Sequence, residues 1–282
     1  MKKIICSLIL LCFSLVPVQA KDVLLVSIDP IAWILEEIAG KDYEIISIVH
    51  AGASPHTFEP TPRQLVNMSQ AKVYFCLYLP FELQFLNALK NNNPAMVLVD
   101  LNENVEKLPS LHHGNHIHSV SAIGFDVHTW LDPLNARHQA QTMLSSLISL
   151  NPARAAFYEA NFVNLNNKLA DLHETLTQEL KPCQGRNFLV YHPAYAYFAH
   201  RYGLEEIPVE FEGKQPSPKQ LMSLHNLVAK GKMTILLLQP QYPHAGDWAV
   251  GIGVQAVAID PLNKNYVENL KVIGSLLQKT CQ

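Results

Sequence analysis

Short apolar runs alternate with amphipathic stretches along the first hundred residues. The runs are rich in β-branched side chains and are typical of buried strands, whereas the stretches between them have helical spacing. The pattern predicts strands over Val23–Ile28, Ile45–Val49, Val73–Leu77 and Met96–Val99, and helices over Pro30–Ala39, Pro62–Ser69 and Phe81–Leu89. Such alternation is typical of βα units around a mainly parallel sheet.

The longest periodic stretch follows Asn151, which can cap a helix that begins at Pro152. Apolar residues then recur in steps of four and three and define one helical face. They are Tyr158, Phe162, Leu165, Leu169, Leu172, Leu176 and Leu180. The pattern predicts a helix from about Pro152 to Leu180, roughly 40 Å long. Its length and central place indicate a rigid connector between two lobes, although an ordinary long core helix would have the same periodicity.

The alternation resumes after this helix. Strands are predicted over Phe188–Tyr191, Thr234–Leu238 and the end of Gly251–Ile259, and helices over Ala194–Tyr202, Ser217–Lys230 and Asn265–Lys279. The predicted fold class is therefore α/β, with two lobes of parallel-sheet βα units joined by a long rigid helix. We divide the chain into a signal peptide (1–20), an N-terminal lobe (21–150), the connecting helix (151–181) and a C-terminal lobe (182–282).

The N-terminus has the pattern of a cleavable secretory signal peptide. Lys2 and Lys3 form a positive start, residues 4–16 are apolar, and residues 18–20 resemble a small-residue cleavage site. The apolar run is shorter than the roughly 20 residues that span a bilayer. We therefore expect an exported soluble protein that begins at Lys21, most simply in a bacterial periplasm.

Cleavage would leave 262 residues, enough for two modest domains. It would also remove two lysines and lower the formal net charge from −3 to −5. The chain has no basic run or charged tail, which argues against nucleic-acid binding. A mildly acidic surface favours the approach of cations only weakly. We expect a monomer.

Three cysteines follow the predicted cleavage site. In an oxidising compartment two of them can pair, and Cys183 and Cys281 stand at the beginning and the end of the C-terminal half. Two unpaired cysteines are the alternative. Cys76 lies in an apolar run and is predicted to be a buried strand residue. The absence of a Cys-x-x-Cys pair from the sequence argues against a thiolate zinc finger.

Four separated positions carry candidate metal ligands. They are His56, His128, His192 and Asp260, spaced by 72, 64 and 68 residues, and each is predicted to lie where a strand meets a loop. Three imidazoles and one carboxylate suit Zn²⁺. Ligands this far apart meet only where the fold brings four loops together, so the metal would lie between substructures. That position favours the capture of an ion over a structural role.

A second histidine cluster lies in the polar, aperiodic segment 108–125, which is predicted to be a mobile loop. Its members are His112, His113, His116 and His118. One hypothesis is a low-affinity loop that collects zinc for the main site. The alternative is a solvated loop whose histidines are incidental.

The same ligand set could instead hold a catalytic zinc with a bound water. The sequence lacks His-Glu-x-x-His and has no further convincing general base near the ligands. Asp126 and Asp132 flank His128 and are expected to orient its ring as acceptors. An exported zinc-dependent hydrolase or metal-dependent adhesin therefore remains a weaker alternative to a binding protein.

Several longer motifs, in this order, resemble one family. They are GASPHTFEP at 52–60, HTWLDP at 128–133, HPAYAYF at 192–198, EGKQPSP at 212–218 and IDPL at 259–262. Over nearly the whole predicted mature chain they resemble the metal-specific substrate-binding proteins of ABC importers, and among these the periplasmic zinc-binding (ZnuA-type) members.

The resemblance implies a metal held between two lobes, with His56 and His128 from the first and His192 and Asp260 from the second. Manganese members usually carry a glutamate in place of His192, so the resemblance favours zinc. A protein that binds manganese or another divalent metal is the alternative. The loop at 112–118 is shorter than in many zinc members and lacks their acidic run.

The implied function is high-affinity capture of Zn²⁺ in the periplasm and its delivery to the membrane permease of an ABC importer. Zinc would be the transported ligand, and the protein would not be an enzyme. Because imidazoles bind metal only when neutral, the affinity is expected to fall as the pH drops through about 6.5.

Overall fold

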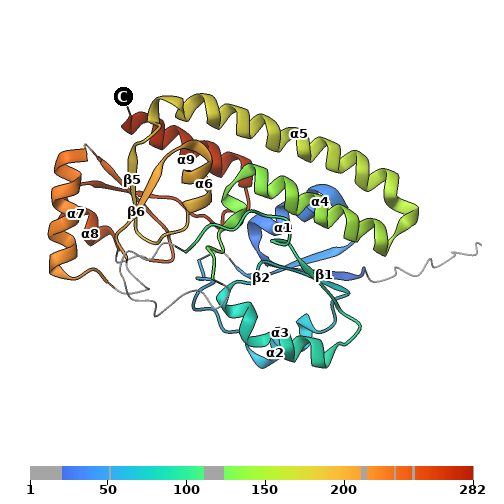
Figure 1. Cartoon of the computed structure of the whole chain (residues 1–282). Coiled ribbons are helices and arrows are strands. Elements are labelled where there is room, and N and C mark those ends of the chain that lie inside the picture. Colours follow the sequence, from blue (N-terminus) through green and yellow to red (C-terminus); the bar gives the residue numbers. More distant parts are fainter. Residues whose placement is uncertain are drawn as a thin grey trace, which may run out of the picture.

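The computed structural model describes residues 21–50, 52–110, 124–210, 215–231, 233–242 and 245–281. The predicted signal peptide and the histidine cluster at 112–118 lie outside these ranges. Within them the chain forms two α/β lobes, each around a four-stranded parallel sheet, with one long helix packed along both (Figure 1). The predicted fold class is confirmed.

The N-terminal lobe contains four parallel strands in the order β2-β1-β3-β4. These strands are β1 (Val23–Ile28), β2 (Glu44–Val49), β3 (Val73–Cys76) and β4 (Val97–Asp100), and the helices between them are α1 (Asp29–Ala39), α2 (Pro62–Met68) and α3 (Pro80–Asn92). The central strands β1 and β3 are almost completely buried, which explains why their sequences are continuous apolar runs. All seven elements match the sequence prediction closely.

The sequence pattern does not give the bounds of helix α4 (Pro133–Leu150), which completes this lobe. The helix begins at Asp132, whose side chain accepts a hydrogen bond from Leu134 N at 2.9 Å. Its buried face includes small and polar residues such as Ala136, Gln139 and Ala140. Their apolar periodicity is weak, so the helix is hard to detect from sequence.

The C-terminal lobe has the same plan, with the strand order β6-β5-β7-β8. Its strands are β5 (Asn187–Val190), β6 (Glu205–Pro208), β7 (Ile235–Leu238) and β8 (Gln255–Ala258), and its helices are α6 (Ala196–Tyr202), α7 (Pro218–Gly231), α8 (Gly246–Ile252) and α9 (Tyr266–Thr280). The sequence pattern misses β6 and α8. The first is a short edge strand that contains two glutamates and a proline, and the second is a seven-residue helix with two glycines, so local propensity is low in both.

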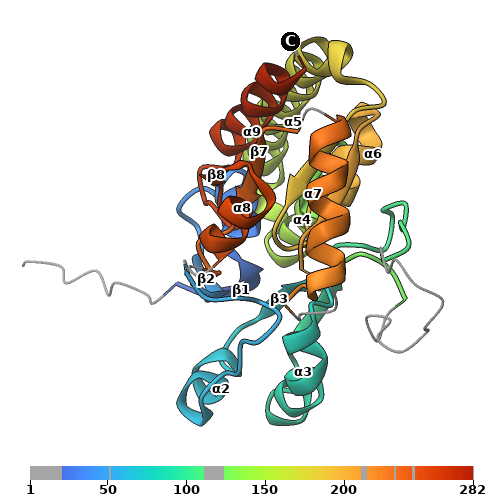
Figure 2. The same cartoon turned by 90° about the vertical axis from the view of Figure 1, so that its left-hand side faces the viewer.

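Helix α5 (Ala155–Leu180) is the predicted long helix, preceded by a 3₁₀ turn at Pro152–Arg154 and followed by another at Lys181–Cys183. It packs against α1 and α4 of the N-terminal lobe and against α6 and α9 of the C-terminal lobe. Its leucine stripe, from Leu165 to Leu180, is buried. Helices α5 and α9 lie on one side of the molecule, and α2 and α3 lie on the opposite side (Figure 2).

A disulfide joins Cys183 to Cys281, with 5.3 Å between the Cα atoms. It connects the end of α5 to the end of α9, which confirms the pairing expected from the sequence. Cys76 is buried in β3, also as expected. No helix in the described part of the chain is long and apolar enough to cross a membrane.

Hydrogen bonds join the two lobes next to His128. Trp130 Nε1 donates to Pro261 O at 3.0 Å, and Tyr266 Oη donates to Trp130 O at 2.6 Å. All three residues are buried or nearly so. The segment that carries His128 is therefore fixed against the C-terminal lobe.

Candidate metal centre

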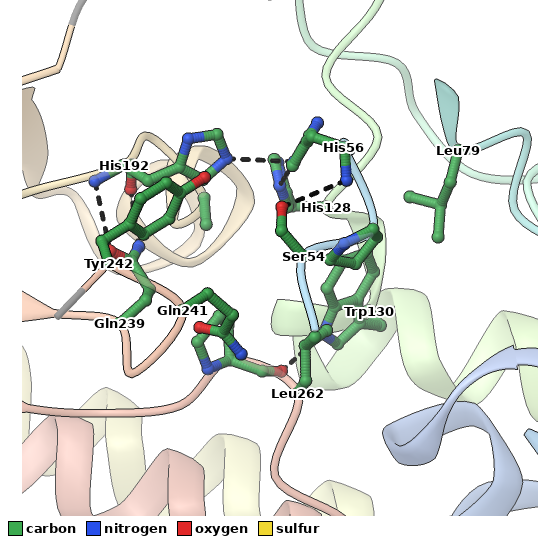
Figure 3. Close-up of a pocket in the computed structure, with 13 residues that line it drawn as sticks. Ser54, His56, Leu79, His128, Trp130, His192, Gln239, Gln241, Tyr242 and Leu262 are labelled. Atoms are coloured by element: carbon green, nitrogen blue, oxygen red, sulfur yellow. Dashed lines mark hydrogen bonds between the residues drawn. The ribbon is translucent and has the colours of Figure 1, made fainter. Parts of the chain in front are cut away.

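Three imidazoles from the two lobes converge in one pocket (Figure 3). His56 Nε2 lies 3.2 Å from His128 Nε2 and 3.0 Å from His192 Nε2, and the three ligand atoms all lie within 4.8 Å of one another. Two nitrogens bound tetrahedrally to one Zn²⁺ at about 2.0–2.1 Å would be about 3.3 Å apart. The two distances from His56 Nε2 are close to those of ligands that share one metal ion.

The three rings cannot satisfy one another with hydrogen bonds. The Nδ1 atoms of His128 and His192 face carboxylates, so in the neutral rings Nδ1 carries the proton and Nε2 presents a lone pair. His56 Nε2 could donate a proton to only one of these lone pairs. A divalent cation would satisfy all three nitrogens at once.

His56 lies in the loop between β2 and α2. The Ser54 hydroxyl accepts a hydrogen bond from His56 N at 3.3 Å. Thr61 closes the loop by capping α2, and its side chain and the side chain of Gln64 bond each other's backbone N–H groups. Among the described residues, no carboxylate is hydrogen-bonded to the His56 ring, so this ligand is held less firmly than the other two.

His128 lies directly before a 3₁₀ turn (Thr129–Leu131). Asp126 Oδ1 accepts a hydrogen bond from His128 N at 2.8 Å and lies 2.9 Å from His128 Nδ1. Burial alone would raise the pKa of the Asp126 carboxyl, but attraction to His128 and the hydrogen bonds from it hold that pKa below its usual value. Asp126 therefore orients the ring as expected.

Two expectations about the His128 segment are wrong. Asp132 caps α4 and forms an ion pair with Arg201 at 2.7 Å, so it does not orient the His128 ring. No strand precedes His128 within residues 124–127, so this histidine is not at a strand end.

His192 follows β5 by two residues. Its Nδ1 lies 3.2 Å from Glu210 Oε1. The ring stacks on Tyr242, with 5.5 Å between the ring centroids and 25° between the planes. The carboxylate and the aromatic ring restrict the imidazole on two sides, which directs Nε2 towards His56.

A buried carboxyl group supports the backbone just after His192. Glu206, on β6, accepts hydrogen bonds at Oε1 from Ala194 N and Tyr195 N, both at 2.9 Å. Burial raises the pKa of Glu206 to about 8. Because Ala194 lines the pocket, the Glu206 side chain holds part of the pocket wall in place.

The pKa values of two ligands favour metal binding. Burial, together with repulsion from His192 and His128, lowers the pKa of His56 well below its ordinary value of 6.5. Burial also lowers the pKa of His192, against the opposing hydrogen bond to Glu210. Both imidazoles are therefore neutral at pH 7, which is the form that binds a metal.

Asp260 lies outside the group of converging ligand atoms. It follows β8 by two residues, and its Oδ1 accepts hydrogen bonds from Gln241 Nε2 at 3.0 Å and from Leu262 N at 2.9 Å. Leu262 and Gln241 line the pocket, whereas Asp260 does not. The assignment of Asp260 as a fourth ligand stays a prediction.

The pocket between the three rings is small, with about 20 Å³ of free space. That is room for about one water molecule or ion. Its walls include Trp130 from the N-terminal lobe and Leu262 from the C-terminal lobe, so both lobes enclose it. The arrangement can bind a single divalent cation.

Sequence reasoning did not identify three residues that contact His192, namely Glu210, Gln239 and Tyr242. Gln239 directly follows a predicted strand, so the preference for functional residues at strand ends could have identified it. Glu210 follows a strand that the pattern does not reveal. Nothing in the sequence marks Tyr242.

Two α/β lobes joined by a long helix, with three converging imidazoles between them, define a metal-binding protein of the solute-binding class. The chain belongs to the ZnuA family, since the family described as zinc-uptake complex component A, periplasmic, matches residues 24–278. Members are solute-binding proteins and not enzymes, and the chain is a metal-binding component of ABC metal uptake.

Solved structures of ZnuA are similar over almost the whole chain. One has a TM-score of 0.84 and 31% sequence identity, and the match covers 93% of this chain and 100% of that chain. A ZnuA deletion mutant with zinc bound has a TM-score of 0.82 and 32% identity, with 92% and 97% of the two chains covered.

Curated relatives include one protein named only for metal binding and one named for manganese. A putative metal-binding protein of Chlamydia muridarum is 28% identical over 267 residues, which are 92% of this chain and 91% of the relative. The manganese-binding lipoprotein MntA of Halalkalibacterium halodurans is 27% identical over 178 residues, 62% of this chain and 56% of the relative. The comparisons therefore establish metal binding without selecting the metal.

Proposed function

We propose that the chain captures Zn²⁺ with high affinity in the periplasm and delivers it to the membrane permease of an ABC importer. The observation that carries this proposal is the convergence of the Nε2 atoms of His56, His128 and His192 between the two lobes. Carboxylates face the outer nitrogens of two of these rings, an arrangement typical of metal-binding histidines.

The ligand chemistry favours zinc over manganese. Three imidazole nitrogens suit Zn²⁺, whereas Mn²⁺ usually binds more oxygen ligands. Asp260 would provide a fourth ligand if its carboxylate left Gln241 and Leu262 N. The similarity to a ZnuA variant with zinc bound supports the same choice.

The permease as a partner follows from the family. A metal that draws together ligands from two lobes changes the surface around the pocket, and this gives a permease a difference between the loaded and the empty protein. Export through the predicted signal peptide at residues 1–20 would place the protein where such a permease receives its cargo.

Elemental analysis tests this proposal on protein purified from its native compartment without added metal. We expect about one zinc per chain, and no retained zinc in a His192→Ala variant purified in the same way. Manganese in place of zinc would contradict the metal assignment, and a metal-free wild-type protein would contradict the capture function.

A further inference from the structure

The parallel pairing of β5 and β7 ends just before the ligand His192. The last backbone hydrogen bond of this pairing runs from Tyr191 N to Leu237 O at 2.9 Å. The backbone N–H and C=O groups of His192 come next, at the edge of the pocket. Buried backbone groups need hydrogen-bond partners, and β7 no longer supplies them.

The side chain of Gln239 supplies both partners. Its Oε1 accepts a hydrogen bond from His192 N at 3.2 Å, and its Nε2 donates to His192 O at 2.7 Å. Gln239 directly follows β7, lines the pocket and is only 1% exposed. In Figure 3 its side chain lies beside His192 on the side of the pocket formed by the C-terminal lobe.

We propose that Gln239 is a positioning residue for metal capture, because its amide extends the β5–β7 pairing by one residue and fixes the backbone of His192. The inference rests on the proposed metal-binding role of His192. Glu210 and Tyr242 contact the His192 ring, but neither holds its backbone. Gln239 therefore fixes the position of the His192 backbone, whereas Glu210 and Tyr242 fix the orientation of the His192 ring.

A primary amide is well suited to this task. It offers one acceptor and one donor in a plane, as a peptide group does. A leucine has a similar size but no polar atom, so it would leave both backbone groups of His192 without their partners. Losing a residue that orients a metal ligand typically costs about 10–100-fold in metal affinity.

The test combines Gln239→Leu with His192→Ala in a double-mutant cycle, measured by competition of Zn²⁺ with a chelator. In the wild-type background we expect the Zn²⁺ Kd of Gln239→Leu to rise about tenfold or more. In the His192→Ala background the same change should raise the Zn²⁺ Kd less than about twofold, because the ligand that Gln239 positions is absent. In a His128→Ala background it should still weaken binding severalfold. Gln255→Leu, at an exposed position in β8, is the matched control and should leave the affinity unchanged.

Equal losses of Zn²⁺ affinity in the wild-type and His192→Ala backgrounds would overturn the inference, because they would show that Gln239→Leu disturbs the C-terminal lobe in general. An unchanged Kd in Gln239→Leu would overturn it as well. If that variant does not fold, Gln239→Asn keeps an amide but is too short to reach both backbone groups, and it should show the same pattern. A wild-type chain that binds no Zn²⁺ would contradict the proposed function itself, whereas wild-type binding without coupling would contradict only the role of Gln239.

Discussion

The three ligand histidines are held with unequal firmness. His128 and His192 each have a carboxylate at Nδ1, whereas among the described residues the His56 ring contacts the other two imidazoles and has no carboxylate partner. A ring without an orienting partner loses more conformational freedom when it binds a metal. We therefore expect His56 to be the ligand that joins the metal last.

Proton competition at His56 and His192 should begin only below the ordinary histidine range. The pKa of His56 lies well below 6.5 and that of His192 is also lowered, so both rings stay neutral as the pH falls from 8 to about 6.5. Protonation of these two rings should therefore not weaken Zn²⁺ binding over that range, and should weaken it only at lower pH. Titration calorimetry at a series of pH values checks this, and a steep loss of affinity between pH 8 and 7 would contradict it.

The same pKa shifts contribute to the way the stability of the metal-free protein depends on pH. Unfolded histidines take up protons near pH 6.5, whereas folded His56 and His192 do so only at lower pH. Below about pH 6.5 these two histidines therefore bind more protons in the unfolded state, and their contribution to the free energy of unfolding falls on acidification. The raised pKa of Glu206 contributes in the opposite direction.

At the residue level, the sequence suffices to predict the three histidines and Asp126, because ligand type and neighbouring residues mark them. The hydrogen bonds of Asp260 could not be predicted, since Gln241 lies nineteen residues away and nothing in the sequence connects the two. The strand-end position of Gln239 is visible in the sequence, but its hydrogen bonds to His192 could not be predicted, because 47 residues separate the two.

At the level of elements, α5 and α9 approach closely because of one glycine. A Cβ atom placed on Gly274, in α9, would lie 2.4 Å from Leu176 Cδ2, and Leu176 is fully buried. Real Cβ atoms essentially never come this close, so a larger residue at 274 would have to push the two helices or the leucine aside. The glycine thus permits the contact between the long helix and the C-terminal helix.

We predict that Gly274→Ala destabilises the protein by about 1–3 kcal/mol, the usual cost of overpacking a core. Gly251→Ala, in α8, is the matched control, because a Cβ there meets no atom within 4 Å. Alanine favours helix by up to about 1 kcal/mol over glycine, so this variant should be neutral or more stable. Chemical denaturation of both variants measures the difference, and equal stabilities would contradict the packing account.

The long helix was the most predictable element, since seven apolar positions repeat over the 23 residues from Tyr158 to Leu180. In contrast, α4 buries Gln139, which donates a hydrogen bond to Thr129 at 2.9 Å and belongs to a buried polar network. Such a network replaces apolar periodicity with side-chain hydrogen bonds. A pattern of hydrophobic positions cannot reveal it.

At the level of the whole molecule, several contacts restrict motion of one lobe against the other. Helix α5 packs against both lobes, the Cys183–Cys281 disulfide joins its end to α9, and Trp130 bonds Pro261 beside the pocket. We therefore expect the loaded and empty proteins to differ mainly near the pocket and less by a wide hinge movement.

The alternation of strands and helices was sufficient to predict two lobes, but the contacts between the lobes could not be predicted because they join residues far apart in the sequence.

The most direct test of the account is a competitive titration of chelator-stripped protein with Zn²⁺ and Mn²⁺, on the wild type and on two histidine variants. We predict one Zn²⁺ per chain, bound more tightly than Mn²⁺, and a loss of more than about 100-fold in His192→Ala, beyond the effect of losing an orienting residue. His200→Ala, at an exposed position on α6, should bind as the wild type does. A preference for Mn²⁺, or wild-type affinity in His192→Ala, would contradict a zinc site built from histidines of both lobes.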